Sequence, residues 1–235
     1  MTMPRKTPAT RASLDRELQG IQDSVLRLGE LVDGAIQKAI QSLAARDTSL
    51  ARSVVSEDAA INRLRFQTEE ACLALIATQQ PAAGDLRTVV AAMNIVSDLE
   101  RMADHAAGIA RIVLRMGDEP LLKPLIDIPR MAEACRQMLR DSLAAFVQRD
   151  AEQARSIAGM DDTIDGLYQQ VFRELLSFMV EDPRTTTRAL YLLFAAHNLE
   201  RIGDRATNIA ERVVFMTSGE MRELNPEPRD TAHLE

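Results

Sequence analysis

The chain repeats itself about a hundred residues apart, and this duplication limits the folds that it can adopt. The stretch DAAINRL, which begins at Asp58, returns as DDTIDGL from Asp161, an offset of 103 residues. Farther on, DLERMADHA from Asp98 returns as NLERIGDRA from Asn198, an offset of 100 residues. A repeat of this length predicts one structural unit that is built twice.

Helical periodicity indicates what that unit is. Apolar residues recur every three to four positions along both copies, which is typical of amphipathic helices. Aromatic residues make up only 3 % of the chain and Trp is absent, whereas strands are usually richer in aromatic residues. We therefore predict an all-α fold of two pseudo-symmetric three-helix bundles side by side. The expected helices span about residues 14–43, 50–78, 85–116, 129–149, 151–180 and 185–216, with Asp85 as the N-cap of the third.

The repeats also set the expected domain organisation. The only Pro-rich connector in the interior is GDEPLLKPLIDIP, and the last residues are polar and contain Pro. We predict a basic flexible arm at 1–12, a first repeat at 13–117, a linker at 118–128, a second repeat at 129–217 and a flexible tail at 218–235.

Composition argues against several functional classes. The net charge of −7 disfavours a nucleic-acid partner, which would need clustered Lys and Arg. Neither a signal peptide nor a membrane span is visible, so we expect a soluble, cytoplasmic protein. We interpret Cys72 and Cys135, which lie in helical patterns, as buried free thiols. No phosphate-binding loop, nucleophile elbow or Cys/His dyad points to an enzyme.

Acidic pairs four residues apart are the unusual feature of both copies. Like charges at this spacing repel each other on a helix by roughly 0.2–0.5 kcal/mol. With Leu99 at the centre of the buried face, Glu100 and Asp104 fall together on one flank, at the border between core and water. Each copy carries two oxygen-rich pairs on neighbouring helices: Asp58 with Asn62 and Glu100 with Asp104, then Asp161 with Asp165 and Glu200 with Asp204.

A single acidic pair is most often just a solvated helix face. Four pairs at matched positions favour a binding site, because carboxylate and amide oxygens from adjacent helices suit hard cations such as Mg²⁺, Mn²⁺, Ca²⁺ or iron. A cation would turn the repulsion into coordination. A di-iron oxidase would need a Glu-x-x-His step. Here His105 follows Asp104 directly and His197 precedes Glu200, which disfavours the oxidase.

These motifs resemble those of the PhoU family of phosphate-signalling regulators. The resemblance rests on DLERMADHA, NLERIGDRATNIAE, DAAINRL, DDTIDGL and LIATQQPAAGDLR, and it covers about Leu14 to Met216. It implies two three-helix bundles with metal clusters at E/D-x-x-x-D motifs, which fall on the four pairs above. Asn62 replaces the final acid of its motif, and Gly108 stands where the second copy has Asn208 in the row of Glu200. We therefore expect the second copy to hold metal more firmly.

The resemblance also implies a function that the residues alone do not give. Family members are negative regulators of the phosphate regulon, which link the ATPase of a phosphate-specific ABC transporter to a sensor histidine kinase. They act as adaptors without turnover, reach the membrane only through their partners, and are often homodimers. The metal would be iron, zinc, manganese or magnesium. Three alternatives stay open: an accessory regulator of another phosphate transporter, a carboxylate-bridged metalloenzyme, and a helical scaffold without metal.

Overall fold

Long helices make up almost all of the computed structural model, which describes residues 8–225. Within this range there is no strand, and the all-α prediction is confirmed. The elements are α1 (Pro8–Ala45), α2 (Thr48–Gln79), α3 (Ala83–Met116), α4 (Asp127–Gln148), α5 (Ala151–Glu181), the short 3-10 helix η1 (Pro183–Thr185) and α6 (Thr186–Ser218).

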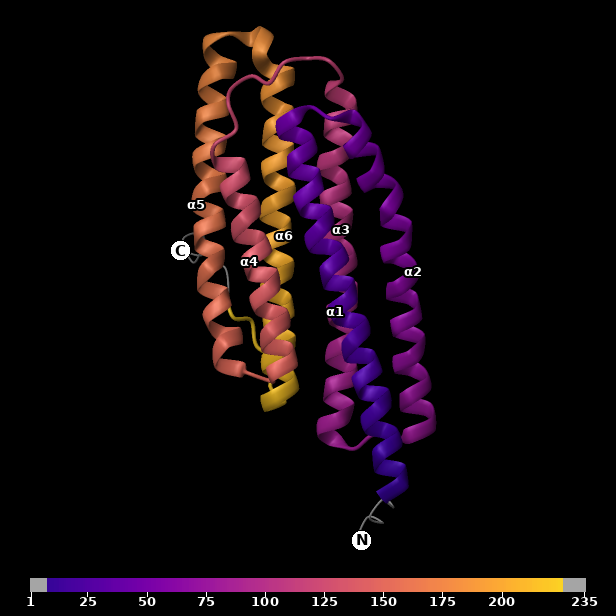
Figure 1. Cartoon of the computed structure of the whole chain (residues 1–235). Coiled ribbons are helices and arrows are strands. Elements are labelled where there is room, and N and C mark those ends of the chain that lie inside the picture. The colour runs from indigo at the N-terminus through magenta and orange to yellow at the C-terminus, as the bar shows by residue number, and fades with distance from the viewer. Residues whose placement is uncertain (1–7, 226–235) are drawn as a thin grey trace, which may run out of the picture.

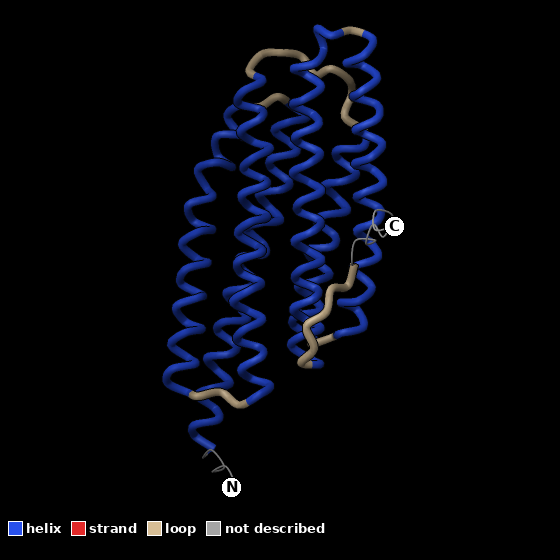
Figure 2. The backbone as a smooth tube through the Cα atoms, turned by 180° about the vertical axis from the view of Figure 1, so that it is seen from behind, coloured by secondary structure: helices blue, strands red, loops and turns tan. Residues whose placement is uncertain are grey.

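The six helices form two three-helix bundles, α1–α2–α3 and α4–α5–α6, side by side (Figure 1). Four of them make a layer in the order α2, α3, α6, α5, and α1 and α4 cover one face of that layer (Figures 1 and 2). The most extensive contact among the described helices joins α3 to α6, which run in opposite directions. This antiparallel contact unites the two bundles.

Reciprocal contacts between α3 and α6 reveal a pseudo-twofold axis. Asp98 of α3 accepts hydrogen bonds from Arg205 at 3.5 Å and Asn208 at 3.3 Å. Asn198, at the equivalent position of α6, meets His105 of α3, with 3.0 Å between Oδ1 and Nδ1. Contacts from position i of one unit to position j of the other, and from j to i, are the mark of twofold symmetry.

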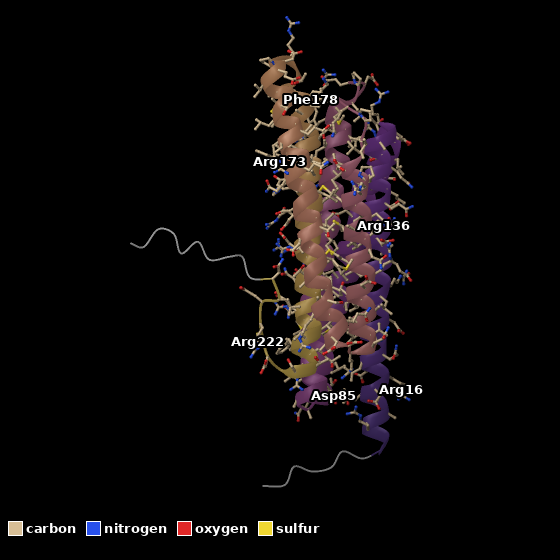
Figure 3. The ribbon with its side chains drawn as sticks, turned by 90° about the vertical axis from the view of Figure 1, so that its left-hand side faces the viewer. Arg16, Asp85, Arg136, Arg173, Phe178 and Arg222 are labelled. Carbon is tan, nitrogen blue, oxygen red and sulfur yellow. The ribbon has the colours of Figure 1, made fainter. Side chains whose placement is uncertain are left out.

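The same axis explains an ion pair between α1 and α4. Asp33 and Arg136 are equivalent positions at the 103-residue offset, so each faces its own counterpart across the axis. Arg136, on the α4 side of the molecule in Figure 3, donates two hydrogen bonds of 2.8 Å to Asp33. Identical side chains here would repel if both were charged, whereas the opposite charges form a bidentate pair.

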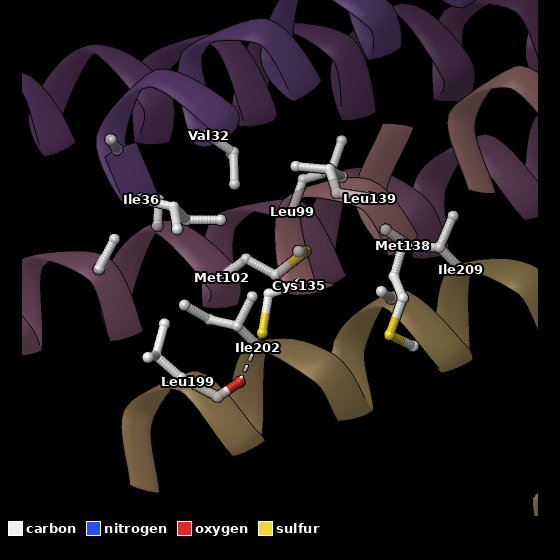
Figure 4. Packing of buried hydrophobic residues seen from close by; sticks show 14 of the residues in the cluster. Val32, Ile36, Leu99, Met102, Cys135, Met138, Leu139, Leu199, Ile202 and Ile209 are labelled. Carbon is white, nitrogen blue, oxygen red and sulfur yellow. Dashed lines mark hydrogen bonds between the residues drawn. The ribbon is translucent and has the colours of Figure 1, made fainter. Parts of the chain in front are cut away.

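The two bundles share one hydrophobic core. Figure 4 shows the centre of this core, where four helices contribute side chains. They are Val32 and Ile36 of α1, Leu99 and Met102 of α3, Cys135, Met138 and Leu139 of α4, and Leu199, Ile202 and Ile209 of α6. Cys72 and Cys135 are buried free thiols, as predicted. No described helix has both the length and the apolar character that crossing a bilayer requires.

The turns between the first two helices of each bundle are built alike. Arg46 and Arg149, at the 103-residue offset, both adopt left-handed backbone angles, with φ of 56° and 55°. Asp47 and Asp150 follow and cap α2 and α5, each accepting two backbone hydrogen bonds. The recurrence of this strained backbone in both turns of the chain supports the duplication at the level of single residues.

Two expectations about helix ends need correction. The prediction of Asp85 as an N-cap was wrong: α3 begins two residues earlier, and Asp85 binds Arg11 of α1 instead. Helix α1 begins at Pro8, inside the predicted arm, because Pro suits a first helical turn; residues 1–7 lie outside the described range. In the predicted tail, Leu224 packs against the core and its backbone N–H donates to Glu211 of α6, while residues 226–235 lie outside the described range.

Two leucines of α2 test the assignment of core and surface. Leu75 is 1 % exposed and Leu73 is 57 % exposed. We expect Leu75→Ala to lower the free energy of unfolding by about 2–5 kcal/mol, because it removes buried methyl groups and leaves a cavity. The matched change Leu73→Ala should cost less than about 0.5 kcal/mol. Urea unfolding measures both, and equal losses would contradict the packing of α2.

Candidate metal centre

The predicted ligands gather into one acid cluster per repeat. The first acid cluster consists of Asp58 and Asn62 of α2 with Glu100 and Asp104 of α3. The second acid cluster consists of Asp161 and Asp165 of α5 with Glu200 and Asp204 of α6. Asp98 and Asn198 use the flanks on which α3 and α6 face each other, so the acids lie on the opposite flanks, toward α2 and α5.

In the first acid cluster the charges of three carboxylates act on one another. Burial, and after it the charge of Asp104, raises the pKa of Asp58. Burial and Asp104 likewise raise the pKa of Glu100, with a smaller effect from Asp58. Asn62 donates a hydrogen bond of 3.3 Å to Oδ2 of Asp58. The structure thus brings all four predicted residues of this repeat to one place.

The second acid cluster shows the same effects more strongly. Burial, and after it the charge of Asp204, raises the pKa of Glu200 to about 7, with smaller contributions from Asp165 and Asp161. Burial, followed by Asp165 and Asp204, raises the pKa of Asp161 to about 6. Gly203 lets α5 approach α6 here, since a Cβ at Gly203 would lie 3.0 Å from Oδ1 of Asp161.

Neighbouring arginines explain why the pKa values of the carboxyl groups are raised less in the first acid cluster than in the second. Arg111 lowers the pKa of Asp58 and Arg65 lowers that of Glu100. The second repeat has Tyr168 in place of Arg65, at the 103-residue offset, and Glu211 in place of Arg111, at the 100-residue offset. The second acid cluster therefore holds one more acid and lacks two of the compensating arginines.

Each cluster leaves buried carboxylate oxygens without hydrogen bonds. Within the described residues, Oδ1 of Asp58, Oδ1 of Asp161 and Oε2 of Glu200 accept none. Asp161 is only 7 % exposed, so water reaches it poorly. His197, one turn before Glu200, places Nδ1 3.3 Å from that oxygen without hydrogen-bond geometry. Buried oxygens of this kind cost about 1–3 kcal/mol each unless something binds them.

The donor set fits a hard cation, provided that the side chains rotate. In their present rotamers no three His, Cys, Asp or Glu residues in the described range converge on one metal position. Carboxylates that repel one another favour rotamers that point apart, and staggered alternatives are accessible about each side-chain bond. Oxygen ligands alone suit magnesium, manganese or iron better than zinc, which prefers nitrogen and sulfur. Metal binding at these residues stays a prediction.

One part of the expected ligand row was wrong. Asn208 does not join the second acid cluster, because its side-chain amide donates to Asp98 of α3 across the repeat interface. Gly108 does not mark a missing metal ligand in the first repeat either. It leaves room for Asn198 of α6, because a Cβ at this position would lie 2.8 Å from Oδ1 of Asn198. Both residues serve the α3–α6 contact. The larger number of acidic residues in the second acid cluster replaces them as the reason to expect firmer binding.

Sequence reasoning also missed a contribution from the end of the described chain. The side chain of Asn225 acts to lower the pKa of Asp161, against the larger effects of burial and of the neighbouring acids that raise it. No periodicity or motif marks Asn225, because it follows the last helix in a stretch without regular structure.

A duplicated three-helix fold with an acid cluster in each copy defines a class of all-α proteins built from a repeated bundle, and comparison with known proteins identifies the family. The model of the PhoU domain matches residues 25–113 and 128–213. The chain belongs to the PhoU family.

Relatives and solved structures match over most of the chain. The phosphate-specific transport system accessory protein PhoU homolog of Aquifex aeolicus is 40 % identical over 208 residues, which cover 88 % of this chain and 94 % of the relative. The homolog of Pseudomonas putida is 37 % identical over 206 residues, covering 86 % and 80 %.

Two crystal structures are similar to the chain. PhoU from Pseudomonas aeruginosa gives a TM-score of 0.84 at 34 % identity and covers 88 % of this chain and 99 % of that one. The phosphate transport system regulatory protein PhoU from Streptococcus pneumoniae gives 0.83 at 35 % identity and covers 89 % and 99 %. These likenesses agree with two pseudo-symmetric bundles.

The raised pKa values predict how pH affects stability without metal. Asp161 and Glu200 have native pKa values of about 6 and about 7, above the usual values near 4 for unfolded carboxyls. The native state therefore binds more protons than the unfolded state between about pH 4 and pH 7, so these groups lower the free energy of unfolding as pH rises through that window. The substitution Glu200→Gln should remove part of this fall in the free energy of unfolding, because glutamine does not ionise.

Urea unfolding in chelator at about pH 4.5 and pH 7.5 measures the effect. The exposed Glu70→Gln serves as the control for removing a charge outside the clusters. We expect Glu200→Gln to gain stability over wild type at the higher pH and to gain little at the lower pH. A gain that is the same at both pH values would contradict the raised pKa of Glu200.

Proposed function

We propose that this protein is a regulatory adaptor of phosphate uptake that represses the phosphate regulon. In this proposal it couples the ATPase of a phosphate-specific ABC transporter to a sensor histidine kinase on the cytoplasmic side of the membrane. One observation carries it: both repeats match the PhoU domain, and relatives aligned over most of the chain are named accessory proteins of a phosphate-specific transport system. An accessory role, rather than a turnover reaction, fits these names.

The acid clusters would act as cation sites within this adaptor. Asp161, Asp165, Glu200 and Asp204 would hold the cation in the second acid cluster. A bound cation supplies positive charge that neutralises these carboxylates. The residues themselves provide oxygen ligands on two rigid helices, so that rotation of side chains suffices for binding. Of iron, zinc, manganese and magnesium, the oxygen donors favour magnesium, manganese or iron.

The identity of the partner separates this proposal from its closest alternative. Co-purification with a transporter ATPase or a histidine kinase supports the adaptor, whereas co-purification with a different phosphate permease indicates an accessory regulator of that transporter. The homodimer that the family resemblance implies stays a prediction, which light scattering on the purified chain tests.

A matched pair of double variants links the clusters to regulation. Glu200→Ala with Asp204→Ala removes two ligands of the second acid cluster, and Glu100→Ala with Asp104→Ala makes the equivalent change in the first. Both variants should fold, and the free energy of unfolding without metal should rise or stay within about 0.5 kcal/mol, because repulsion is relieved. Mn²⁺ uptake and the thermal stabilisation by Mn²⁺ should fall more in the second-cluster variant.

Regulation should follow the same order. A phosphate-regulon reporter in a deletion strain, complemented with each variant, should lose repression in high phosphate more with the second-cluster variant than with the first-cluster variant. If the second-cluster variant folds, loses Mn²⁺ and represses like wild type, the cluster has no part in signalling.

A further inference from the structure

Large apolar side chains are exposed on α5 and α6, beyond the second acid cluster. We call them the α5–α6 apolar patch, which consists of Phe172, Leu176 and Val180 of α5 with Leu190 and Phe194 of α6. Val180 is 75 % exposed and Phe194 is 53 % exposed. Exposed apolar residues that gather in one place, rather than singly, mark a surface that binds something.

Two rows of side chains connect this patch to the acids. Steps of three or four residues place each row on one flank of its helix: Asp165, Tyr168, Phe172 and Leu176 on α5, and Glu200, His197, Phe194 and Leu190 on α6. The rings of Tyr168 and His197 lie 6.2 Å apart between centroids, so the rows run side by side. Because α5 and α6 are antiparallel (Figure 1), Phe172 and Phe194 come level in the next turn.

The first repeat shows that duplication does not account for the patch. The counterparts of Phe172 and Phe194 are Glu69, at the 103-residue offset, and Asn94, at the 100-residue offset. Glu69 accepts a hydrogen bond of 3.0 Å from Arg65 of the same helix. The flank beyond the acids is therefore polar in the first repeat and aromatic in the second, so the aromatic residues do not serve the fold that both repeats share.

The form and charge of the surroundings favour one kind of occupant. Two antiparallel helices with apolar residues at i, i+4 spacing offer the surface on which another amphipathic helix lays its apolar face. A hollow of about 310 Å³ at one edge of the patch, lined by Leu176, Ser177, Val180 and Glu181, offers room for a side chain. The other edge adjoins the four carboxylates of the second acid cluster, which favour a cationic group on the occupant.

A second copy of the chain fits this surface less well. A twofold contact through the patch would bring the second acid cluster either against itself or against the turn that follows α5. The exposed Glu181 and Asp182 lie at this turn and outnumber Arg184. Acids would therefore face acids in both arrangements, and like charges across an interface oppose association.

We propose that the α5–α6 apolar patch binds an amphipathic α-helix of a partner protein, which places apolar residues on the patch and Lys or Arg over the second acid cluster. The proposal rests on the adaptor function proposed above and states the chemistry of one partner segment. The partner helix completes a four-helix bundle with α4, α5 and α6. Its apolar face removes Phe172 and Phe194 from water, and its cation relieves the repulsion among the acids.

Two double variants separate the patch from ordinary exposed residues. Leu176→Ser with Phe194→Ser changes the patch, and Leu73→Ser with Phe66→Ser makes the same exchanges in the first repeat. Leu73 is the counterpart of Leu176, and Phe66 is 53 % exposed, like Phe194. Both double variants should fold and melt close to the wild type, because all four side chains are exposed.

The probe is a synthetic amphipathic peptide of about 20 residues, the length of α5 beside the patch and the cluster, with Leu at every third or fourth position and Lys at one end. Calorimetry with the full chain in chelator, which makes the result independent of the proposed cation site, should detect binding. The affinity should fall at least about 10-fold in the patch variant and stay unchanged in the first-repeat variant. A peptide with Glu in place of Lys should also bind at least about 10-fold more weakly.

Three results would overturn the proposal: no binding of the Lys peptide, equal losses in the two double variants, or equal affinities of the two peptides. Light scattering tests the second copy as occupant. A wild-type dimer that the patch variant alone dissociates would assign the patch to that copy and would also overturn the proposal.

The phosphate-regulon reporter relates the patch to function. In the deletion strain, the wild type and the first-repeat variant should repress in high phosphate, and the patch variant should lose repression. If the patch variant represses like the wild type, the docking proposal alone fails. If the wild type itself does not repress, the adaptor function fails, and the calorimetry decides whether the patch binds a basic amphipathic helix.

Discussion

The antiparallel contact between α3 and α6 determines where everything else in this molecule lies. Leu99 and Met102 meet Leu199 and Ile202 in the shared core, and reciprocal hydrogen bonds flank them. One flank of α3 packs against α6, and the other flank faces α2. In the same way, one flank of α6 packs against α3, and the other faces α5. The acids of both repeats occupy that second flank, so the pseudo-twofold axis places two related clusters in one rigid body.

Rigidity makes the clusters costly when they are empty. The core holds the backbone of α5 and α6 in place, so Asp161 and Glu200 cannot escape their neighbours by moving apart with their helices. Their repulsion is relieved in one of two ways: by a proton, which the raised pKa values favour, or by a cation.

The repeat and the helical period were sufficient to predict the fold, because both are properties of each helix taken alone. They also predicted the residues of the two clusters, since i, i+4 spacing places side chains on one flank. The roles of Asn208 and Gly108 could not be predicted in this way. Both depend on which residue of α3 lies opposite which residue of α6, and a helical wheel contains no such register.

The compensating arginines were missed for a related reason. Arg111 acts on Asp58 from a neighbouring helix, and its replacement by Glu211 matters only once the two clusters are compared in space.

Anomalous diffraction from crystals grown with limiting Mn²⁺ tests the central claim most directly, because it locates the ion without reference to function. The account predicts a peak within ligand distance of Asp161, Glu200 and Asp204, and a weaker peak beside Asp58 and Glu100. Peaks at neither cluster, or a stronger peak at the first, would contradict the claim that unbalanced carboxylates make the second acid cluster the principal cation site.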